Sequence, residues 1–368
     1  MQRFKPLLPL NGSSVIEYVV SNFRKAGIED ITIVAGHNGD VLKHGVESLG
    51  VRVVFNAQYA EGMYSSVVAG IRALDAGVDG CLLIPADMPL VRSSTVRRVC
   101  NAFRSTGPSV VYPIFQKRRG HPTLISSRLF PAIISGSGAG GLRALLAEHD
   151  SEAHEERVPD EGILIDLDTH ADYVKAQERV RQLDIPTPDE CQAILDELAV
   201  FENIVCHGRK VAEVAERLTV RLKDTGLHLN LALVKASAIL HDVAKGRPDH
   251  ARAGAQILED LGFPEVARVA GLHMDCDFQK DATLNEGAIV YLADKFVQGD
   301  RIVSLAVRFQ RKFAAARGNG TLQFVQRRWE TAQRIAAAVE HIVGADVRRI
   351  ISPQSEIPDA MVGDVPTH

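Results

Sequence analysis

Residues 236–246 read Ala-Ser-Ala-Ile-Leu-His-Asp-Val-Ala-Lys-Gly, an apolar run that ends in an adjacent histidine and aspartate. We expect one helix from Leu231 to Lys245, terminated by Gly246. On a helix the side chains of His241 and Asp242 point about 100° apart. Imidazole nitrogens and carboxylate oxygens both ligate divalent metals, and ionisable groups at the end of an apolar helix are costly unless they are ligated or paired. The stretch therefore predicts a metal site in a helical unit.

Two more ligand candidates flank this pair along the chain. His207 lies upstream, and Asp294 lies downstream after the apolar residues 289–293. Each is expected on its own helix, so that a histidine, a His-Asp pair and an aspartate would converge on one cation. This order of residues is typical of a metal-dependent phosphohydrolase site.

A second metal is consistent with the remaining histidines. His250 and His273 are candidates to hold that second metal or to grip a phosphate, while Asp242 would bridge two metals. Two metals stabilise both the attacking water and the leaving oxygen of an in-line displacement. Lys245 lies about one helical turn after His241, on the same face, and could offer charge to a phosphate oxygen.

The whole second half reads as helical. Thr187, Pro188 and Glu190 form a predicted capping box with proline at the first helical position, which indicates a linker helix over 184–199. A helical domain follows over 200–345, and the polar, proline-containing residues 346–368 are expected to be a loose tail. Two long amphipathic stretches, 301–315 and 321–343, could pack on the bundle or form a homodimer.

The first half, residues 1–183, alternates strand and helix signals. Short apolar runs predict strands at 31–35, 51–55, 81–84, 109–112 and 163–166. Such alternation favours an α/β sheet with helices on both faces, which binds ligands beyond the carboxyl ends of its strands. Asp87 and Asp166 fall at such ends, where carboxylates could hold the magnesium of a nucleotide.

A polar segment of small residues lies between the second and third predicted strands. Asn56 precedes it, and Gly62, Met63, Ser65 and Ser66 lie near a helix start, where backbone N–H groups can contact a base or phosphate. Taken singly, Ser65 and Ser66 are better explained as helix caps than as ligand contacts.

Length, charge and composition argue against several classes of protein. A chain of 368 residues suggests two domains, and a net charge of −4 gives no basic field for nucleic acid. No apolar run approaches the roughly 18 residues of a membrane span, and the start lacks a signal-peptide pattern. The five cysteines are scattered and form no CxxC pair, which indicates free thiols in the cytoplasm.

Residues 200–310 resemble the HD phosphohydrolase superfamily. The matching residues are His207, His241-Asp242 and Asp294, and His250 and His273 match subgroups with additional histidines. The resemblance implies a helical bundle, a divalent metal (Mn, Ni, Fe or Zn) and hydrolysis of a phosphate mono- or diester.

Residues 1–180 resemble the MobA-like nucleotidyltransferases, especially the molybdenum cofactor cytidylyltransferases. The matching strings are 4–10 (Phe-Lys-Pro-Leu-Leu-Pro-Leu), Gly36-His37, Asn56, Gly62-Met63, Ser65-Ser66, 85–90 (Pro-Ala-Asp-Met-Pro-Leu), 120–122 (Gly-His-Pro) and 166–169 (Asp-Leu-Asp-Thr). The resemblance implies a Rossmann-like domain that transfers a nucleotidyl group from CTP or GTP to a phosphorylated acceptor such as molybdopterin. It further implies that Asp87 and Asp166 hold Mg²⁺, that Lys5 meets the triphosphate, and that His121 lies on the acceptor side.

One departure from that family affects the expected activity. The family opens with a strand and a loop of the form Leu-x-Ala-Gly-x-x-x-Arg-Met-Gly, whereas this sequence starts with Met1 where the methionine of the loop belongs. We expect the first strand and the phosphate cradle to be missing and the edges of neighbouring strands to be unpaired. Either the start codon is placed too late or the domain is truncated and inactive.

Two functional hypotheses follow. The first is a bifunctional cytoplasmic enzyme, a nucleotidyltransferase joined to a metal-dependent phosphohydrolase, whose partners are nucleotides and small phosphorylated metabolites and include neither nucleic acid nor membrane. The alternative is a nucleotide- or cofactor-binding regulator, in which the first domain only binds.

Overall fold

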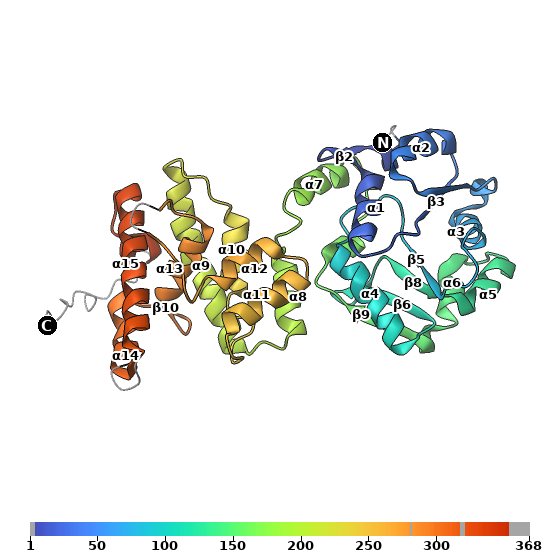
Figure 1. Cartoon of the computed structure of the whole chain (residues 1–368). Helices are drawn as coiled ribbons and strands as arrows, with labels where there is room; N and C mark the ends of the chain where they lie inside the picture. Colours follow the sequence, from blue (N-terminus) through green and yellow to red (C-terminus); the bar gives the residue numbers. More distant parts are fainter. Residues whose placement is uncertain (1–3, 280–281, 317–320, 353–368) are drawn as a thin grey trace. The chain divides into compact units, whose positions relative to one another are not determined.

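The computed structural model describes residues 4–279, 282–316 and 321–352. The chain divides into two compact units, Met1–Leu183 and Asp184–His368. The first unit mixes strands and helices, and the second is almost entirely helical (Figure 1). Within the described residues, no helix is both long and apolar enough to cross a membrane.

The first unit holds a mixed five-stranded sheet and two smaller strand pairs. In the larger sheet the order is β5-β8-β6-β7, with β9 parallel to β6. Separately, β3 pairs with β4 in parallel and β1 pairs with β2. The strands are β1 (Pro9–Leu10), β2 (Ser13–Ser14), β3 (Thr32–Ala35), β4 (Arg52–Phe55), β5 (Gly80–Leu83), β6 (Val110–Phe115), β7 (Arg118–Arg119), β8 (Thr123–Ser126) and β9 (Ala153–Arg157).

Helices cover both faces of the five-stranded sheet. Val110 and Ile125 face α3, α5 and α6, whereas their neighbours Val111 and Leu124 face α4, because successive side chains of a strand point to opposite faces. The prediction of helices on both faces is confirmed. The helices of this unit are α1 (Val15–Lys25), α2 (Gly39–Gly45), α3 (Met63–Arg72), α4 (Ser93–Thr106), α5 (Phe130–Ser135), α6 (Gly141–Ala147) and α7 (His170–Val180).

Four of the five predicted strands are confirmed as β3, β4, β5 and β6, and the fifth is wrong. Residues 161–164 form a short 3-10 helix instead of a strand. The Asp160 side chain accepts a hydrogen bond from the Gly162 amide and so closes a tight turn. At Gly162 a Cβ atom would lie only 2.2 Å from the Leu90 carbonyl oxygen, so this compact turn depends on glycine. Asp166 therefore does not follow a strand.

An apolar cavity of about 760 Å³ is lined by both β3 and β5. Among the strands that the structure describes, β3 pairs only with β4 and β5 only with β8. The expectation of unpaired strand edges is thus confirmed, and the strands do not form one continuous sheet. Thr32 of β3 lines the cavity with a buried hydroxyl that has no hydrogen-bond partner.

A buried ion pair joins the start of α4 to the 3-10 turn at 161–164. Arg92 Nη1 lies 2.7 Å from Asp160 Oδ1, and the two side chains are 4% and 1% exposed. Asp160 also accepts hydrogen bonds from the Arg92 backbone amide, from Thr95 Oγ1 and from the Gly162 amide. An ion pair and these hydrogen bonds therefore compensate the buried charge of the Asp160 carboxylate.

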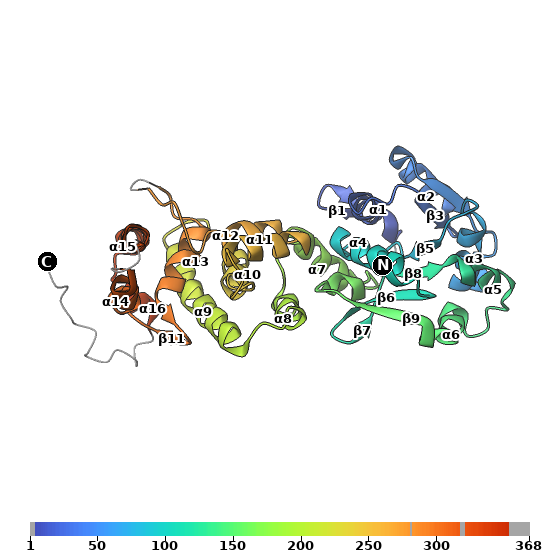
Figure 2. The same ribbon diagram turned by 60° about the horizontal axis from the view of Figure 1, so that its bottom comes forward.

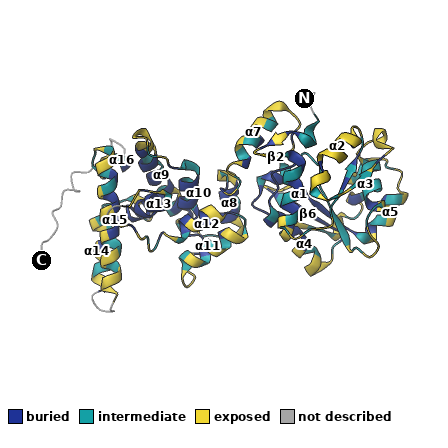
Figure 3. Ribbon diagram, turned by 45° about the horizontal axis from the view of Figure 1, so that its top comes forward, coloured by how far each residue is buried: buried dark blue, intermediate teal, exposed yellow. Residues whose placement is uncertain are grey.

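The second unit is a bundle built around two buried helices. Residues 287–295 of α13 are all buried, and α10 is largely buried (dark blue in Figure 3), as expected for helices that are apolar on all sides. Helix α9 packs against both, and α12 packs against α10 (Figure 2). The helices are α8 (Pro188–Glu197), α9 (Glu202–Asp224), α10 (Leu231–Leu240), α11 (His250–Asp260), α12 (Pro264–Gly271), α13 (Glu286–Lys295), α14 (Leu305–Ala316), α15 (Leu322–Val343) and α16 (Val347–Ile351), with a hairpin of β10 (Val297–Gln298) and β11 (Arg301–Ile302).

Both ends of this unit differ from the sequence prediction. The capping box of Thr187 and Glu190 is confirmed, but α8 is more than a linker because Cys191 and Ile194 belong to the core of the bundle. The predicted loose tail begins too early, because α16 forms and buries Val347 against that core. The rest of that tail, 353–368, lies outside the described residues.

Helix α10 ends at Leu240, five residues before the predicted end. The Nδ1 atom of His241 lies 2.8 Å from the Ala238 carbonyl oxygen. That carbonyl would otherwise accept the hydrogen bond that continues the helix from Asp242. The chain then turns as far as Gly246, whose φ of +95° favours glycine.

Candidate functional site

Six side chains gather from five segments of the second unit into two groups. The first group is His207 of α9, His241 after α10 and Asp294 of α13. The second is Asp242, His250 and His273. Within each group the ligand atoms lie within 4.8 Å of one another, which suits one cation per group. The structure thus brings together the six residues of the second half that the sequence singled out as candidate metal ligands.

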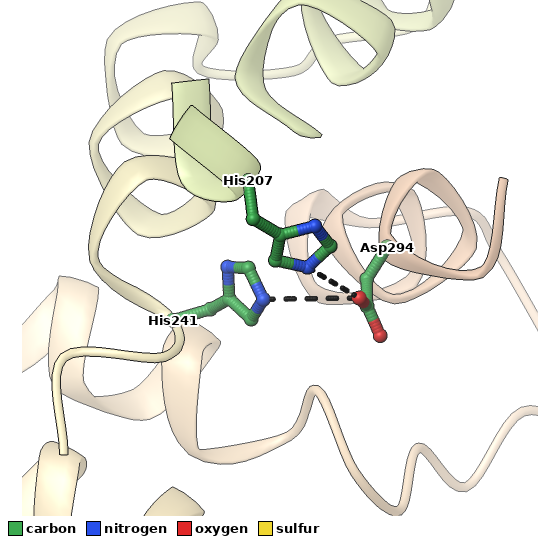
Figure 4. Close-up of side chains that lie close together, drawn as sticks. All are labelled: His207, His241 and Asp294. Atoms are coloured by element: carbon green, nitrogen blue, oxygen red, sulfur yellow. Dashed lines mark hydrogen bonds and ion pairs between the residues drawn. The ribbon is translucent and has the colours of Figure 1, made fainter. Parts of the chain in front are cut away.

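The first group presents two imidazoles to one carboxylate. His207 Nε2 lies 3.1 Å and His241 Nε2 3.8 Å from Asp294 Oδ1 (Figure 4). The opposite nitrogen, Nδ1, lies 2.8 Å from the carbonyl oxygen of Gly299 in His207 and of Ala238 in His241. Since a carbonyl only accepts, each Nδ1 carries a proton, and the neutral His241 therefore turns the lone pair of Nε2 inward. Burial alone would lower the pKa of His207, but the hydrogen bond from its Nε2 to Asp294 and the charge of Asp294 raise it above its ordinary value.

The second group repeats this arrangement. His273 Nδ1 lies 2.7 Å from the Ala270 carbonyl oxygen, so its Nε2 also faces the group. The Nε2 atoms of His250 and His273 are 3.1 Å apart, and each lies 3.3 Å from Asp242 Oδ1. His241 connects the groups, with its Nε2 atom 3.5 Å from Asp242 Oδ2. The two groups therefore form one continuous row.

Charge and burial at this row favour a bound cation. Burial lowers the pKa of His241 to about 4, so its imidazole is neutral near pH 7. Burial alone would raise the pKa of Asp294, but Lys295 and His207 hold it well below its usual range. His241 Nε2 is buried without a hydrogen-bond partner, which is costly unless a cation satisfies it. Mixed histidine and carboxylate ligands suit Mn, Fe, Ni or Zn.

Three cations border the row. Lys245 Nζ lies 2.9 Å from Asp242 Oδ2, Lys295 Nζ lies 2.6 Å from Asp294 Oδ2, and Arg308 Nη2 lies 3.6 Å from Asp294 Oδ1. The expected position of Lys245 on the face of His241 is wrong, because α10 ends before it and the lysine turns to Asp242. Sequence reasoning did not single out Lys295 or Arg308. Lys295 directly follows Asp294, but no pattern marks Arg308, which comes from α14.

Gly208 lets α9 approach α10 next to His207. A Cβ atom at this position would lie 2.5 Å from the Ile239 backbone carbonyl oxygen, so Gly208→Ala must push the two helices apart. We expect a loss of about 1–3 kcal/mol in the free energy of unfolding and about 10- to 100-fold in metal affinity, because His207 and His241 separate. Chemical denaturation and metal titration measure both effects.

The matched control is Gly254→Ala in α11. Its Cβ atom would meet the Val243 side chain at 3.3 Å, and a methyl group can give way where a carbonyl cannot. Metal binding by Gly208→Ala equal to that of Gly254→Ala would contradict the spacing argument.

In the first unit, Lys5 joins two carboxylates. Its Nζ atom lies 2.8 Å from Asp168 Oδ1 and 3.6 Å from Asp87 Oδ2. Asp166 lies two residues before Asp168, is exposed and borders a separate pocket with Lys175. Sequence reasoning left Asp168 without a role, although its spacing from Asp166 across the buried Leu167 gave a signal. The assignment of Mg²⁺ to Asp87 and Asp166 stays a prediction.

Asn56 organises the polar segment that precedes α3. It is buried, and its Nδ2 atom donates to Ser65 Oγ at 2.8 Å and to Ser66 Oγ at 3.0 Å. Gly62 is the N-cap residue of α3 and no side chain caps it, so the explanation of the two serines as caps is wrong. Met63 is 75% exposed.

His121 lies on the wall of the apolar cavity together with Met63 and Ser66. Its Nδ1 atom is 3.4 Å from the Leu83 carbonyl oxygen, and burial lowers the pKa of its imidazole. The structure therefore places two clusters in this unit, the Lys5 cluster with Asp87 and Asp168, and the Asn56 cluster beside the cavity.

Comparison with protein families finds two matches along the chain. Residues 1–153 match the MobA-like NTP transferase domain family, and residues 204–298 match the HD domain family. The HD match spans His207, His241-Asp242 and Asp294.

Three individual proteins illustrate the similarity. The chain is 33% identical over 90 residues to the uncharacterized protein MJ0778 of Methanocaldococcus jannaschii, covering 23% of this chain and 53% of that protein. It is 30% identical over 150 residues to nicotine blue oxidoreductase of Paenarthrobacter nicotinovorans, covering 39% and 73%. The manganese complex of Rv0371C from Mycobacterium tuberculosis superposes with a TM-score of 0.42 at 22% identity, covering 48% and 93%.

The names of these relatives do not point to one common activity. The chain spans about half of the first relative and about three quarters of the second, which is named an oxidoreductase. A shared fold does not fix a reaction, so the chemistry must be argued from the site.

Proposed function

Because the chain belongs to the MobA-like NTP transferase family through its first unit and carries an HD domain in its second, we propose a bifunctional cytoplasmic enzyme. Its second unit would hydrolyse a phosphate ester with a divalent metal. Its first unit would transfer a nucleotidyl group from CTP or GTP, with Mg²⁺, to a phosphorylated acceptor such as molybdopterin.

The single observation that carries the hydrolase proposal is the inward lone pair of His241. Its Nε2 atom is buried without a partner and faces Asp294 and Asp242. Burial keeps the imidazole neutral, and the bond from Nδ1 to Ala238 fixes which nitrogen carries the proton. His207 and His273 are held in the same way by carbonyl oxygens. A site with three imidazoles oriented through Nδ1 and two carboxylates is organised to receive cations.

The residues of the row would divide the work of hydrolysis. A divalent ion there supplies Lewis acidity and makes water a stronger nucleophile near neutral pH. Asp242 and Asp294 would balance its charge, and the bonds to backbone carbonyls would keep the imidazoles oriented. Lys245, about half exposed, would offer its charge to a phosphate oxygen.

Elemental analysis combined with a substrate panel tests the hydrolase. We expect one to two divalent metal ions per chain after purification, and hydrolysis of p-nitrophenyl phosphate or bis-p-nitrophenyl phosphate when Mn²⁺ or Ni²⁺ is added. A chain that binds no metal, or that hydrolyses neither ester with any of the four candidate metals, would contradict the proposal.

The proposed transferase is supported by the Lys5 cluster. Lys5 is a cation placed between Asp87 and Asp168, so it could meet a triphosphate while the carboxylates hold Mg²⁺. Calorimetric titration of the full chain with CTP or GTP and Mg²⁺ tests binding, and release of pyrophosphate in the presence of molybdopterin tests transfer. Binding without transfer would favour a regulator, and no binding of either nucleotide would contradict both roles.

A further inference from the structure

Helix α14 brings positive charge to one end of the metal row. Arg308 lies beside Asp294, which is already paired with Lys295. Lys312, one turn further along α14, lies close enough to Lys295 and Arg308 for their charges to act on it. After burial, which has the largest effect, these two neighbours lower the pKa of Lys312 to about 8. Cations thus gather where a bound metal would add further positive charge.

The Arg308 guanidinium has a buried donor that no group in the described structure accepts from. Its Nε atom is buried without a hydrogen-bond partner, and its Nη2 atom is 3.6 Å from Asp294, beyond hydrogen-bond distance. A guanidinium presents a planar fork of donors that matches the oxygens of a phosphate. The orphaned donor is costly in the protein alone and would be satisfied by such an anion.

The charge balance points to more than one phosphate. Lys245, Lys295 and Arg308 already outnumber the two carboxylates of the row, Asp242 and Asp294. Two divalent ions would add four positive charges, whereas a hydroxide and one phosphate group supply only about three negative charges. A second phosphate is the simplest group that offsets the excess.

We propose that Arg308 and Lys312 hold the leaving phosphate of a substrate with a pyrophosphate bond. This inference rests on the proposed hydrolase function and names its substrate class: nucleotides or other metabolites with two or more linked phosphates. The oxygen of water forms a bond to the phosphorus atom held at the metal row, and the P–O bond to the second phosphate breaks. The leaving phosphate keeps the bonding electron pair and takes one proton of the water, while the other proton stays on the oxygen now bonded to the first phosphorus.

Binding of inorganic pyrophosphate tests the subsite without any metal. The full chain, treated with a chelator, is titrated calorimetrically with inorganic pyrophosphate and with inorganic phosphate. We expect pyrophosphate to bind at least tenfold more tightly than phosphate, and Arg308→Gln to weaken pyrophosphate binding about 10- to 100-fold. Lys312→Gln should weaken it less, and Arg308→Lys, which keeps the charge but not the fork, should fall between Arg308→Gln and the parent chain.

Arg311→Gln is the matched control, because Arg311 is an exposed arginine of the same helix. With Mn²⁺ added, Arg308→Gln should lower kcat/KM for ADP relative to p-nitrophenyl phosphate, and Arg311→Gln should leave that ratio unchanged.

The outcomes separate the two proposals. If phosphate esters are hydrolysed but Arg308→Gln behaves like Arg311→Gln in both assays, the subsite is wrong and the hydrolase stands. If pyrophosphate binding depends on Arg308 but no ester is hydrolysed, the site binds pyrophosphate groups and the hydrolase is wrong.

Discussion

Replacing Asp242 by alanine should reduce phosphate-ester hydrolysis by about a thousandfold or more while the bundle stays folded. Asp242 is the carboxylate of the second group, with Oδ1 3.3 Å from both His250 and His273, and its Oδ2 atom also faces His241. Its loss removes a ligand that would balance the charge of both metals, and each 1.36 kcal/mol of lost transition-state stabilisation costs tenfold in rate.

Metal content distinguishes this effect from unfolding. The variant should bind fewer metal ions per chain than the parent, with a far-ultraviolet circular dichroism spectrum unchanged at 25 °C. Asp260→Asn is the control, because Asp260 is an exposed aspartate of the same unit that contacts Gln256. Undiminished hydrolysis by Asp242→Ala would refute the assignment of the active site.

Asp160→Ala should lower the free energy of unfolding of the first unit by about 3–5 kcal/mol. The substitution leaves the Arg92 guanidinium buried without its carboxylate, and breaking a buried pair in this way is strongly destabilising. Urea denaturation followed by circular dichroism measures the change. Trp329, the only tryptophan of the chain, reports by its fluorescence on the second unit, whose transition should be unaffected.

The control for this prediction is an exposed ion pair of the same unit. Asp150 contacts Arg119 on the surface, and Asp150→Ala should cost far less stability than Asp160→Ala because water screens an exposed pair. If both variants lost equally little stability, the buried pair would not hold α4 to its neighbours.

The residues that gather in the histidine and aspartate row could be predicted from sequence, but the local backbone could not. Histidines and aspartates at the ends of apolar runs indicated ligands whatever the exact path of the chain. The end of α10 depended on a side-chain bond, from His241 to the carbonyl of Ala238, that hydrophobic periodicity does not reveal. For the same reason the expected position of Lys245 on the face of His241 was wrong.

Strand prediction failed where burial did not follow apolar runs. Residues 163–165 are apolar, but Asp160 and Gly162 fix a tight turn there. Conversely, β9 reads Ala-His-Glu-Glu-Arg and gave no apolar signal, because half of its side chains reach solvent or ion pairs such as that of Glu156 with Arg98. Contacts from α14 to the site, such as that of Arg308, depend on tertiary packing and leave no local pattern.

The unpaired edges beside the apolar cavity affect how the first unit fluctuates. Ile31 and Ala35 accept hydrogen bonds from the strand-β4 side, so the alternate residues Thr32 and Val34 turn their main-chain amides away from β4. Without a ladder on that side, these amide protons are free to exchange with deuterium from solvent at rates set by small breathing motions. The amide proton of the neighbouring Ile33 faces β4 and exchanges only when β3 and β4 separate. Amides of the same short strand therefore exchange through two different opening motions, with different rates.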